Sequence, residues 1–153
     1  MAYWLFKTEP STYGFERLKK ERRTEWSGVR NYQARNNMMA MKKGELGFFY
    51  HSSIAQPAII GVCRVSREAY PDFSARDPKS PYYDPKASAE KPIWQMVDVA
   101  YVKALPRPVS LAELRKDPRF SAMPLLARGM RLSVQPVSER HWELVLQLAG
   151  AQP

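Results

Sequence analysis

One short segment holds most of the side chains that could recognise a flat, polar ligand. Residues 24–36 read TEWSGVRNYQARN and combine a tryptophan, a tyrosine, two arginines, two asparagines, a glutamine and a glycine. Arg, Asn and Gln hydrogen-bond base edges and phosphates in fixed geometry, and aromatic rings offer faces for stacking. Few core segments need this mixture, because buried Arg and Asn must be fully paired. The segment therefore predicts a pocket or groove for a nucleobase.

Two further segments place polar side chains at the ends of predicted strands. Lys7 ends an aromatic run, and Tyr50, His51 and Ser52 end the apolar run that starts at residue 46. The plainer interpretations are a solvated lysine and a histidine with a structural hydrogen bond. As acid–base groups, Lys7, Tyr50 and His51 would instead suit an enzyme that processes RNA or a nucleotide. That function remains the alternative, because the sequence offers neither paired carboxylates near the pocket segment nor an activated nucleophile.

Composition and charge limit the class of protein. A chain of 153 residues, 44% of them hydrophobic, is long enough for one globular domain, which we expect to span residues 1–153. It carries 24 Lys and Arg against 15 Asp and Glu, a net charge of +9, and this excess favours DNA or RNA as partner. A barrel for protein contacts is a third possibility, and it predicts no salt-dependent binding to nucleic acid.

Other features point to a protein without metal or cofactor. Cys63 is the only cysteine and there are two histidines, all far apart in the sequence, so we expect no metal site and no cofactor. No apolar run approaches the roughly 20 residues that cross a bilayer, and the N-terminus does not resemble a signal peptide. We therefore expect no membrane contact and a cytoplasmic location, with access to nucleoid or nucleus, and we expect a monomer.

Strands and short helices alternate irregularly along the chain. Hydrophobic periodicity predicts strands over residues 3–8, 46–52, 57–65, 94–105 and 132–137, and helices over residues 13–20, 32–43, 111–115, 123–128 and 139–148. Asn31, Ser110 and Ser138 are the expected N-caps, and Gly44 is expected to close the second helix. The order of elements lacks a steady strand–helix–strand rhythm, so we expect an α+β fold, a mixed β-barrel surrounded by short helices.

Residues 69–92 contain five prolines and predict a long irregular connection. Tyr82 and Tyr83 lie in its middle, and Trp94 follows it. Any of the three rings could complete an aromatic pocket, and the tyrosines could equally pin the loop to the barrel. The sequence leaves this choice open.

Several motifs together resemble the EVE-domain family. They are WLFKTEP at residues 4–10, WSGVRNYQARN at 26–36, FFYHS at 48–52, EAYPD at 68–72 and SVQP at 133–136. The resemblance covers essentially the entire chain, in order. It implies a PUA-like fold and a kinship with YTH domains, which read a methylated adenine in RNA through an aromatic cage.

The resemblance further implies a non-catalytic reader of a modified base, namely a methylated or oxidised-methyl pyrimidine or a methyladenine, in DNA or RNA. By this match Trp26 forms one wall of a cage, with Lys7 and Thr8 beside it. The predicted base pocket consists of Trp26, Ser27, Val29, Asn31, Tyr32, Tyr50, His51, Ser52 and Trp94. The predicted phosphate contacts are Lys7, Arg30, Arg35 and Asn36. Because stacking is tolerant of base identity, we expect Ser27, Asn31 and Ser52 to read the base edge.

Overall fold

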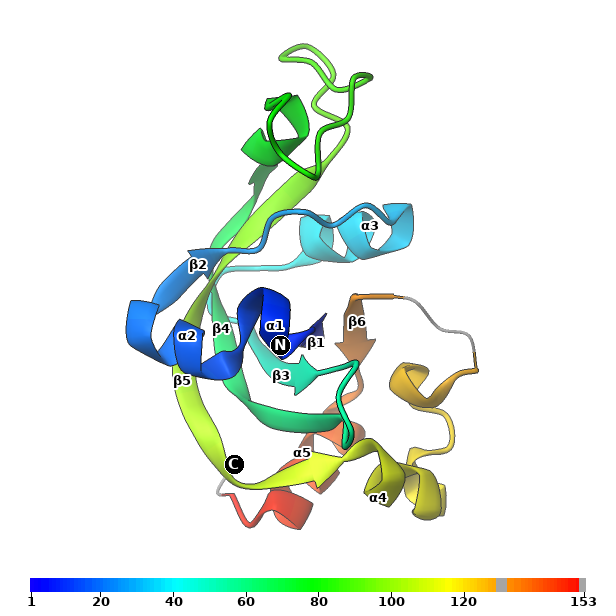
Figure 1. Ribbon diagram of the computed structural model, residues 1–153. Helices are drawn as coiled ribbons and strands as arrows, with labels where there is room; N and C mark the ends of the chain where they lie inside the picture. Colours follow the sequence, from blue (N-terminus) through cyan, green and yellow to red (C-terminus); the bar gives the residue numbers. More distant parts are fainter. Residues whose placement is uncertain (129–131, 152–153) are drawn as a thin grey trace.

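A six-stranded mixed sheet organises the part of the chain that the computed structural model describes, residues 1–128 and 132–151 (Figure 1). The strands are β1 (Tyr3–Thr8), β2 (Arg23–Glu25), β3 (Leu46–His51), β4 (Ala58–Pro71), β5 (Gln95–Ser110) and β6 (Val134–Val137). Their order is β2-β5-β4-β3-β1-β6, with β1 and β3 parallel and the other neighbours antiparallel. The sheet curves strongly, and the α+β class is confirmed.

Short helices cover both faces of this sheet. They are α1 (Pro10–Tyr13), α2 (Phe15–Glu21), α3 (Tyr32–Ala40), α4 (Leu111–Lys116) and α5 (Glu139–Ala149), with single 3₁₀ turns at Phe73–Arg76, Pro118–Phe120 and Pro124–Leu126. Figure 1 shows α4 and α5 at one end of the curved sheet and the β4–β5 connection at the other. The middle of the molecule carries α1, α2 and α3.

Alternation along the strands divides the core into two clusters. Phe6 and Phe49 belong to one cluster with Trp26, whereas Leu5 and Tyr50 belong to the other. Successive side chains of a strand point to opposite faces, so adjacent residues of β1 and of β3 enter different cores. This division decides which side chains can share a site.

The three predicted N-caps are confirmed. The side-chain oxygens of Asn31, Ser110 and Ser138 accept hydrogen bonds from the backbone N–H of Ala34, Glu113 and His141, at 2.9, 3.1 and 3.1 Å. Each cap satisfies one of the N–H groups that a helix start leaves without a partner. The cap at Asn31 fixes where α3 begins, directly after the pocket segment.

Three predicted helices differ in the structure. The helix expected over residues 13–20 is two helices, because Gly14 is extended (φ −93°, ψ 164°) between α1 and α2. The helix expected to reach Gly44 ends at Ala40, since Met41 is already extended and is its C-cap. Only the 3₁₀ turn Pro124–Leu126 forms in the third segment, and Gly129, its expected end, lies outside the described residues.

The two longest strands extend beyond their predicted ends. Strand β5 continues to Ser110 through Pro106 and Pro108, because residues 105–108 lie opposite a single residue of β4 in a bulge, where no ladder hydrogen bond is required. Strand β4 continues to Pro71, so the irregular part of the connection is shorter than expected. Together β4 and β5 form a long arm that carries residues 72–94, which we call the β4–β5 connection (Figure 1).

Candidate functional site

A cleft of about 700 Å³ opens where the end of β1 meets α1, α2 and the segment between β2 and α3. It is lined by residues 7–9, Thr12, Tyr13, Arg17, residues 24–31, Tyr82 and Ser133. The first part of the segment that carries most of the recognition chemistry, residues 24–31, therefore lines this cleft without a gap. Of the predicted site residues, Lys7, Trp26, Ser27, Val29, Arg30 and Asn31 come together here.

Trp26 forms a rigid wall of the cleft. The residue is only 8% exposed, and it lines the cleft. The rings of Phe6, Phe49 and Tyr13 contact the indole in edge-to-face geometry, with centroids 5.2, 5.7 and 6.4 Å away. The Trp26 backbone N–H donates to the Val97 carbonyl at 2.7 Å. The indole is thus held in place before any ligand arrives.

Tyr82 supplies the second aromatic ring. It comes from the β4–β5 connection and covers Gly28, which has a φ of +85°. A Cβ on Gly28 would lie 2.8 Å from the Tyr82 ring, so only glycine permits both this backbone conformation and this contact. Tyr83 does not line the cleft and is 43% exposed. Of the three rings that the sequence left open, Tyr82 is the one in the cleft.

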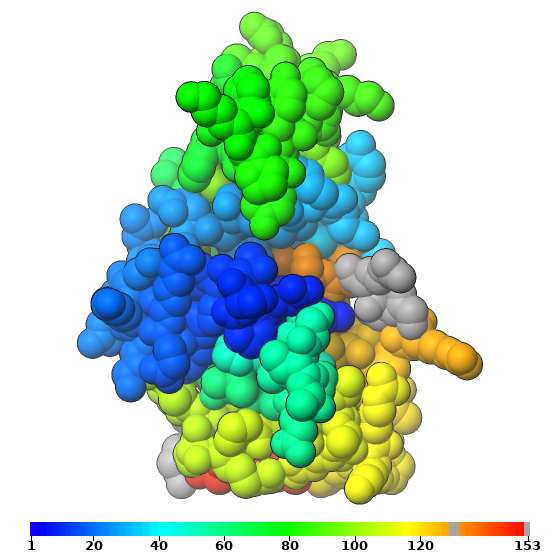
Figure 2. All heavy atoms as spheres, viewed as in Figure 1, coloured from blue at the N-terminus to red at the C-terminus, as the bar shows by residue number. Residues whose placement is uncertain are grey.

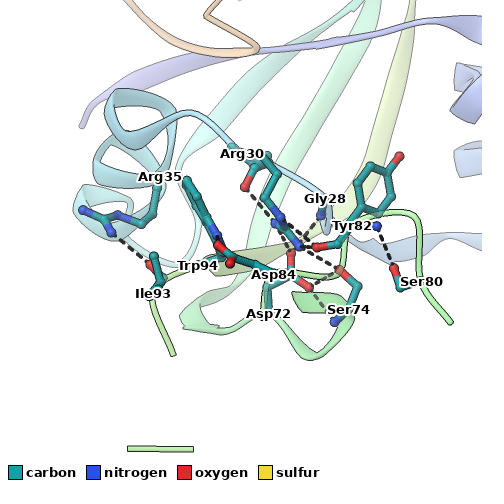
Figure 3. Close-up of polar contacts among 11 residues, drawn as sticks. Gly28, Arg30, Arg35, Asp72, Ser74, Ser80, Tyr82, Asp84, Ile93 and Trp94 are labelled. Atoms are coloured by element: carbon teal, nitrogen blue, oxygen red, sulfur yellow. Dashed lines mark hydrogen bonds and ion pairs between the residues drawn. The ribbon is translucent and has the colours of Figure 1, made fainter. Parts of the chain in front are cut away.

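A buried carboxylate ties the β4–β5 connection to the pocket segment (Figure 3). Asp72, 2% exposed, accepts hydrogen bonds from the Gly28 N–H at 2.8 Å and from Arg30 Nη1 at 3.1 Å. Its other oxygen accepts from the Ser74 N–H and hydroxyl at 2.8 and 2.6 Å. A buried carboxylate is tolerable only with such complete pairing.

Arg30 completes this attachment, and we call Asp72 and Arg30 together the clasp. Its Nε and Nη2 donate to the Tyr82 carbonyl at 3.0 and 2.6 Å, and Nη2 also donates to Ser74 Oγ at 3.2 Å. The guanidinium lies 5.6 Å from the Tyr82 ring centroid and 5.4 Å from that of Trp94. The sequence predicted a phosphate contact here, but the structure commits the guanidinium to bonds within the protein. Arg30 positions Tyr82.

Tyr32, Arg35, Asn36 and Trp94 lie together outside the cleft. The Tyr32 ring stacks on Trp94 at 4.8 Å, and Trp94 Nε1 donates to Asp84 Oδ2 at 2.7 Å. Arg35 donates to the Ile93 carbonyl at 2.9 Å and to Asn36 Oδ1 at 3.0 Å. Tyr32 and Trp94 were predicted to line the base pocket, and the structure places them instead where they attach the β4–β5 connection to α3.

Tyr50, His51 and Ser52 do not line the cleft either. Tyr50 is 2% exposed in the opposite core, where burial raises its pKa. His51 Nε2 accepts a hydrogen bond from the Phe15 N–H at 3.1 Å, and burial lowers its pKa. The Ser52 N–H donates to the Thr8 carbonyl at 2.9 Å. Because adjacent residues of β3 point to opposite faces, Lys7, Tyr50 and His51 do not meet in one site.

Positive and negative side chains nearly balance in the cleft. The Lys7 ammonium has no ion pair or side-chain hydrogen bond within the described ranges. Arg17 pairs with Glu21 at 3.1 Å, and Glu21 also accepts from the Tyr13 hydroxyl at 2.7 Å. Burial and this bond raise the pKa of Tyr13 to about 12, so its hydroxyl stays a donor. Glu9 and Glu25 add two carboxylates to the cleft wall. This balance suits a polar, uncharged ring better than a phosphate.

Five lining residues were not singled out from the sequence. They are Glu9, Thr12, Tyr13, Arg17 and Ser133, and they reach the cleft from the residue after β1, from α1 and α2, and from the residue before β6. Only Glu9 and Ser133 had a signal, because they belong to the WLFKTEP and SVQP motifs. Within the described residues, no three His, Cys, Asp or Glu side chains gather into a possible metal site, and no helix has the length and apolar character needed to span a membrane.

Comparison with known proteins finds a single family along nearly the whole chain. A family model described as the EVE domain matches residues 2–148. Human thymocyte nuclear protein 1 is 38% identical over 170 aligned residues, which cover 99% of this chain and 76% of that protein. A crystal structure of a protein from Pseudomonas putida has a TM-score of 0.94 at 46% identity and covers 97% of this chain and 99% of its own.

Two solved structures similar to this chain contain nucleic acid. Human THYN1 protein in complex with 5-methylcytosine containing DNA has a TM-score of 0.90 at 39% identity, with both chains covered completely. A YTH domain from Zygosaccharomyces rouxii, in complex with N6-methyladenosine RNA, has a TM-score of 0.53 at 15% identity, with 99% of this chain and 86% of that chain covered. The second likeness shows the fold alone, and the predicted PUA-like fold is confirmed.

Proposed function

The chain belongs to the EVE-domain family, and on that premise we propose that it is a non-catalytic nucleic-acid-binding module that reads a modified base. The base enters the cleft, stacks on the exposed part of Trp26 and is bordered by Tyr82. One observation carries the proposal: the cleft of about 700 Å³ has a fixed indole as its wall. The human relative solved with 5-methylcytosine DNA supports a methylated cytosine in DNA as the first ligand to test.

In this proposal the polar groups around the cleft decide which base the protein binds. Stacking contributes about 1–3 kcal/mol per base and tolerates any base. Selectivity therefore comes from hydrogen bonds to the base edge, for which Ser27, Asn31 and Thr8 line the cleft. The Asn31 side-chain oxygen is engaged by the cap of α3, so its amide N–H₂ is the group left to donate. Lys7 holds a carbonyl of the base or the phosphate next to it.

The distribution of the acid–base candidates supports binding over catalysis. Lys7 lines the cleft, whereas Tyr50 lies in the other core and His51 is bonded to the Phe15 N–H. Acid–base catalysis needs its groups within hydrogen-bond reach of one reacting molecule. We propose binding as a monomer, in a compartment where nucleic acid is accessible.

The experiment compares two tryptophans that are almost equally buried. Trp26 and Trp142 are 8% and 4% exposed, but Trp142 packs in the opposite core on Phe48. We expect the wild type and Trp142→Leu to bind a DNA oligonucleotide with one 5-methylcytosine more tightly than the unmodified strand. We expect Trp26→Leu to bind the methylated strand about 1–3 kcal/mol more weakly than the wild type does, because the indole on which the base stacks is gone.

Fluorescence anisotropy titrations measure these affinities, and thermal melts check that both variants are folded. The same strand as RNA, and a strand with N6-methyladenine, test the other ligand classes. Preferential binding of a modified strand by Trp26→Leu at the wild-type affinity would refute the proposed base site.

A further inference from the structure

The cleft does not offer enough free cations for the phosphates on either side of a bound base. Arg30 is committed to Asp72 and the Tyr82 carbonyl, and Arg17 is paired with Glu21. Lys7 shares the cleft with the carboxylates of Glu9 and Glu25. The chain nevertheless carries a net charge of +9. A nucleic-acid strand must therefore find its main electrostatic contacts outside the cleft.

A basic segment begins and ends at the rim of the cleft. Residues 17–23, RLKKERR, form most of α2 and the start of β2, and both Arg17 and Thr24 line the cleft. Leu18 is buried and holds the helix to the sheet, which turns Lys19 and Lys20 outward. Figure 2 shows α2 and β2 in blue at one side of the molecule, beside the darker blue of α1.

The positive charge of this segment is only partly neutralised. Arg23 pairs with Asp98 at 2.6 Å, and the one carboxylate of the segment, Glu21, is already engaged by Arg17 and Tyr13. For Lys19 and Lys20 no ion pair is found in the part of the chain that the structure describes. Their ammonium groups remain available to an external anion.

Arg22 sits in a backbone conformation that disfavours it. Its φ is +72°, in the left-handed region that glycine adopts freely and a large side chain does not. It caps α2, with its N–H donating to the Leu18 carbonyl at 2.7 Å, and its guanidinium lies 5.6 Å from the Tyr101 ring centroid. Strain of this kind is concentrated at functional positions. Glycine would adopt this conformation without strain, so the presence of arginine indicates that its positive charge has a function.

We propose that Lys19, Lys20 and Arg22 form a phosphate-binding surface, the α2–β2 surface, which holds the DNA backbone next to the base in the cleft. This inference rests on the proposed function for the position of the base. Its contacts are to phosphates and therefore carry no base preference. They add affinity only for a ligand that has a strand beyond the bound base.

The test uses two variants of the surface and one control. Arg22→Gly removes a cation and relieves the left-handed strain, so its Tm should equal or exceed that of the wild type. The double variant Lys19→Gln/Lys20→Gln removes two cations without touching the backbone. The control is Lys116→Gln/Arg140→Gln, which removes two exposed cations from α4 and α5 at the far end of the sheet.

Each variant is titrated with 5-methyl-2′-deoxycytidine and with a single-stranded DNA oligonucleotide carrying one 5-methylcytosine, at several salt concentrations. Nucleoside affinity should match the wild type in all variants. Oligonucleotide Kd should rise about fivefold per removed charge in the surface variants, as expected for a charge-assisted contact. The log–log salt slope should flatten by about 0.7 per lost phosphate contact. The control should change neither.

The proposal is overturned if both surface variants keep the wild-type oligonucleotide slope, or if the control flattens it equally. Failure of the proposed base site has a different signature. In that case the wild type would bind neither the nucleoside nor the methylated strand preferentially, while the salt slope would still respond to the α2–β2 surface.

Discussion

At the scale of single residues, the cleft depends on side chains that are held before a ligand binds. Trp26 is enclosed by Phe6, Phe49 and Tyr13, and Tyr82 is placed over Gly28 by its own carbonyl and ring contacts with Arg30. A fixed pair of rings loses little conformational freedom on binding, so more of the stacking energy appears as affinity. The two rings differ in one respect: Trp26 also stabilises the core, whereas Tyr82 is 36% exposed.

Tyr82 therefore allows stacking to be tested without disturbing the core. We expect Tyr82→Ala to weaken binding of the methylated oligonucleotide by about 1–3 kcal/mol, the contribution of one aromatic stack, and Tyr82→Phe to retain it. Tyr83→Ala is the matched control, because Tyr83 is adjacent and similarly exposed but outside the cleft. Anisotropy titrations measure all three. Equal losses in the Tyr82→Ala and Tyr83→Ala variants would contradict the assignment of Tyr82 as a wall.

At the scale of elements, the β4–β5 connection is attached to the body of the protein at its start, middle and end. Arg30 binds Asp72 at the start and the Tyr82 carbonyl in the middle. At the end, Trp94 stacks on Tyr32 of α3. A connection of this length would otherwise be mobile, because it buries few apolar side chains of its own. The clasp thus decides whether Tyr82 stays at the cleft.

Asp72→Asn tests this clasp, because it keeps the size of the side chain and removes its charge. One acceptor oxygen becomes a donor that faces either the Gly28 N–H and Arg30 or the Ser74 N–H, and we expect the free energy of unfolding to fall by roughly 1–3 kcal/mol. Hydrogen exchange should accelerate first in the β4–β5 connection, and affinity for the methylated strand should fall with it. Asp77→Asn, which alters only an exposed turn to the Lys79 N–H, is the control. If hydrogen exchange accelerated equally over the whole Asp72→Asn variant, the clasp would not be what holds the connection.

At the scale of the whole molecule, base recognition and charge are separated in space. The cleft has a near balance of charge, and the excess behind the net charge of +9 lies outside it. Specificity and general attraction to a polyanion can therefore be supplied by different parts of the chain.

This separation predicts different salt responses for two ligands of the wild-type protein. Affinity for the methylated oligonucleotide should fall with rising salt, because bound phosphates release condensed counterions, with a log–log slope of about −0.7 per contacted phosphate on a single strand. Affinity for 5-methyl-2′-deoxycytidine should change little, since it has no phosphate. Titrations across a salt series measure both. A slope near zero for the oligonucleotide would favour the third possibility, a barrel for protein contacts.

The sequence by itself determined the local features. The caps at Asn31, Ser110 and Ser138, the apolar strands and the clustering of recognition residues around Trp26 follow from side-chain chemistry within a few positions. Such features need no knowledge of distant segments. The EVE-domain motifs added the fold, which the relatives confirm.

Only the tertiary structure decided which distant residues share the cleft. Tyr50 and His51 were predicted to line the base pocket from the end of β3. Alternation along the strand instead places Tyr50 in the other core, and His51 is bonded to the Phe15 N–H. Arg30 was predicted to contact phosphate, but in the structure its guanidinium hydrogen-bonds Asp72, which lies 42 residues later in the sequence. Contacts over such separations depend on how strands pair and how a long connection folds back, and no local pattern encodes either.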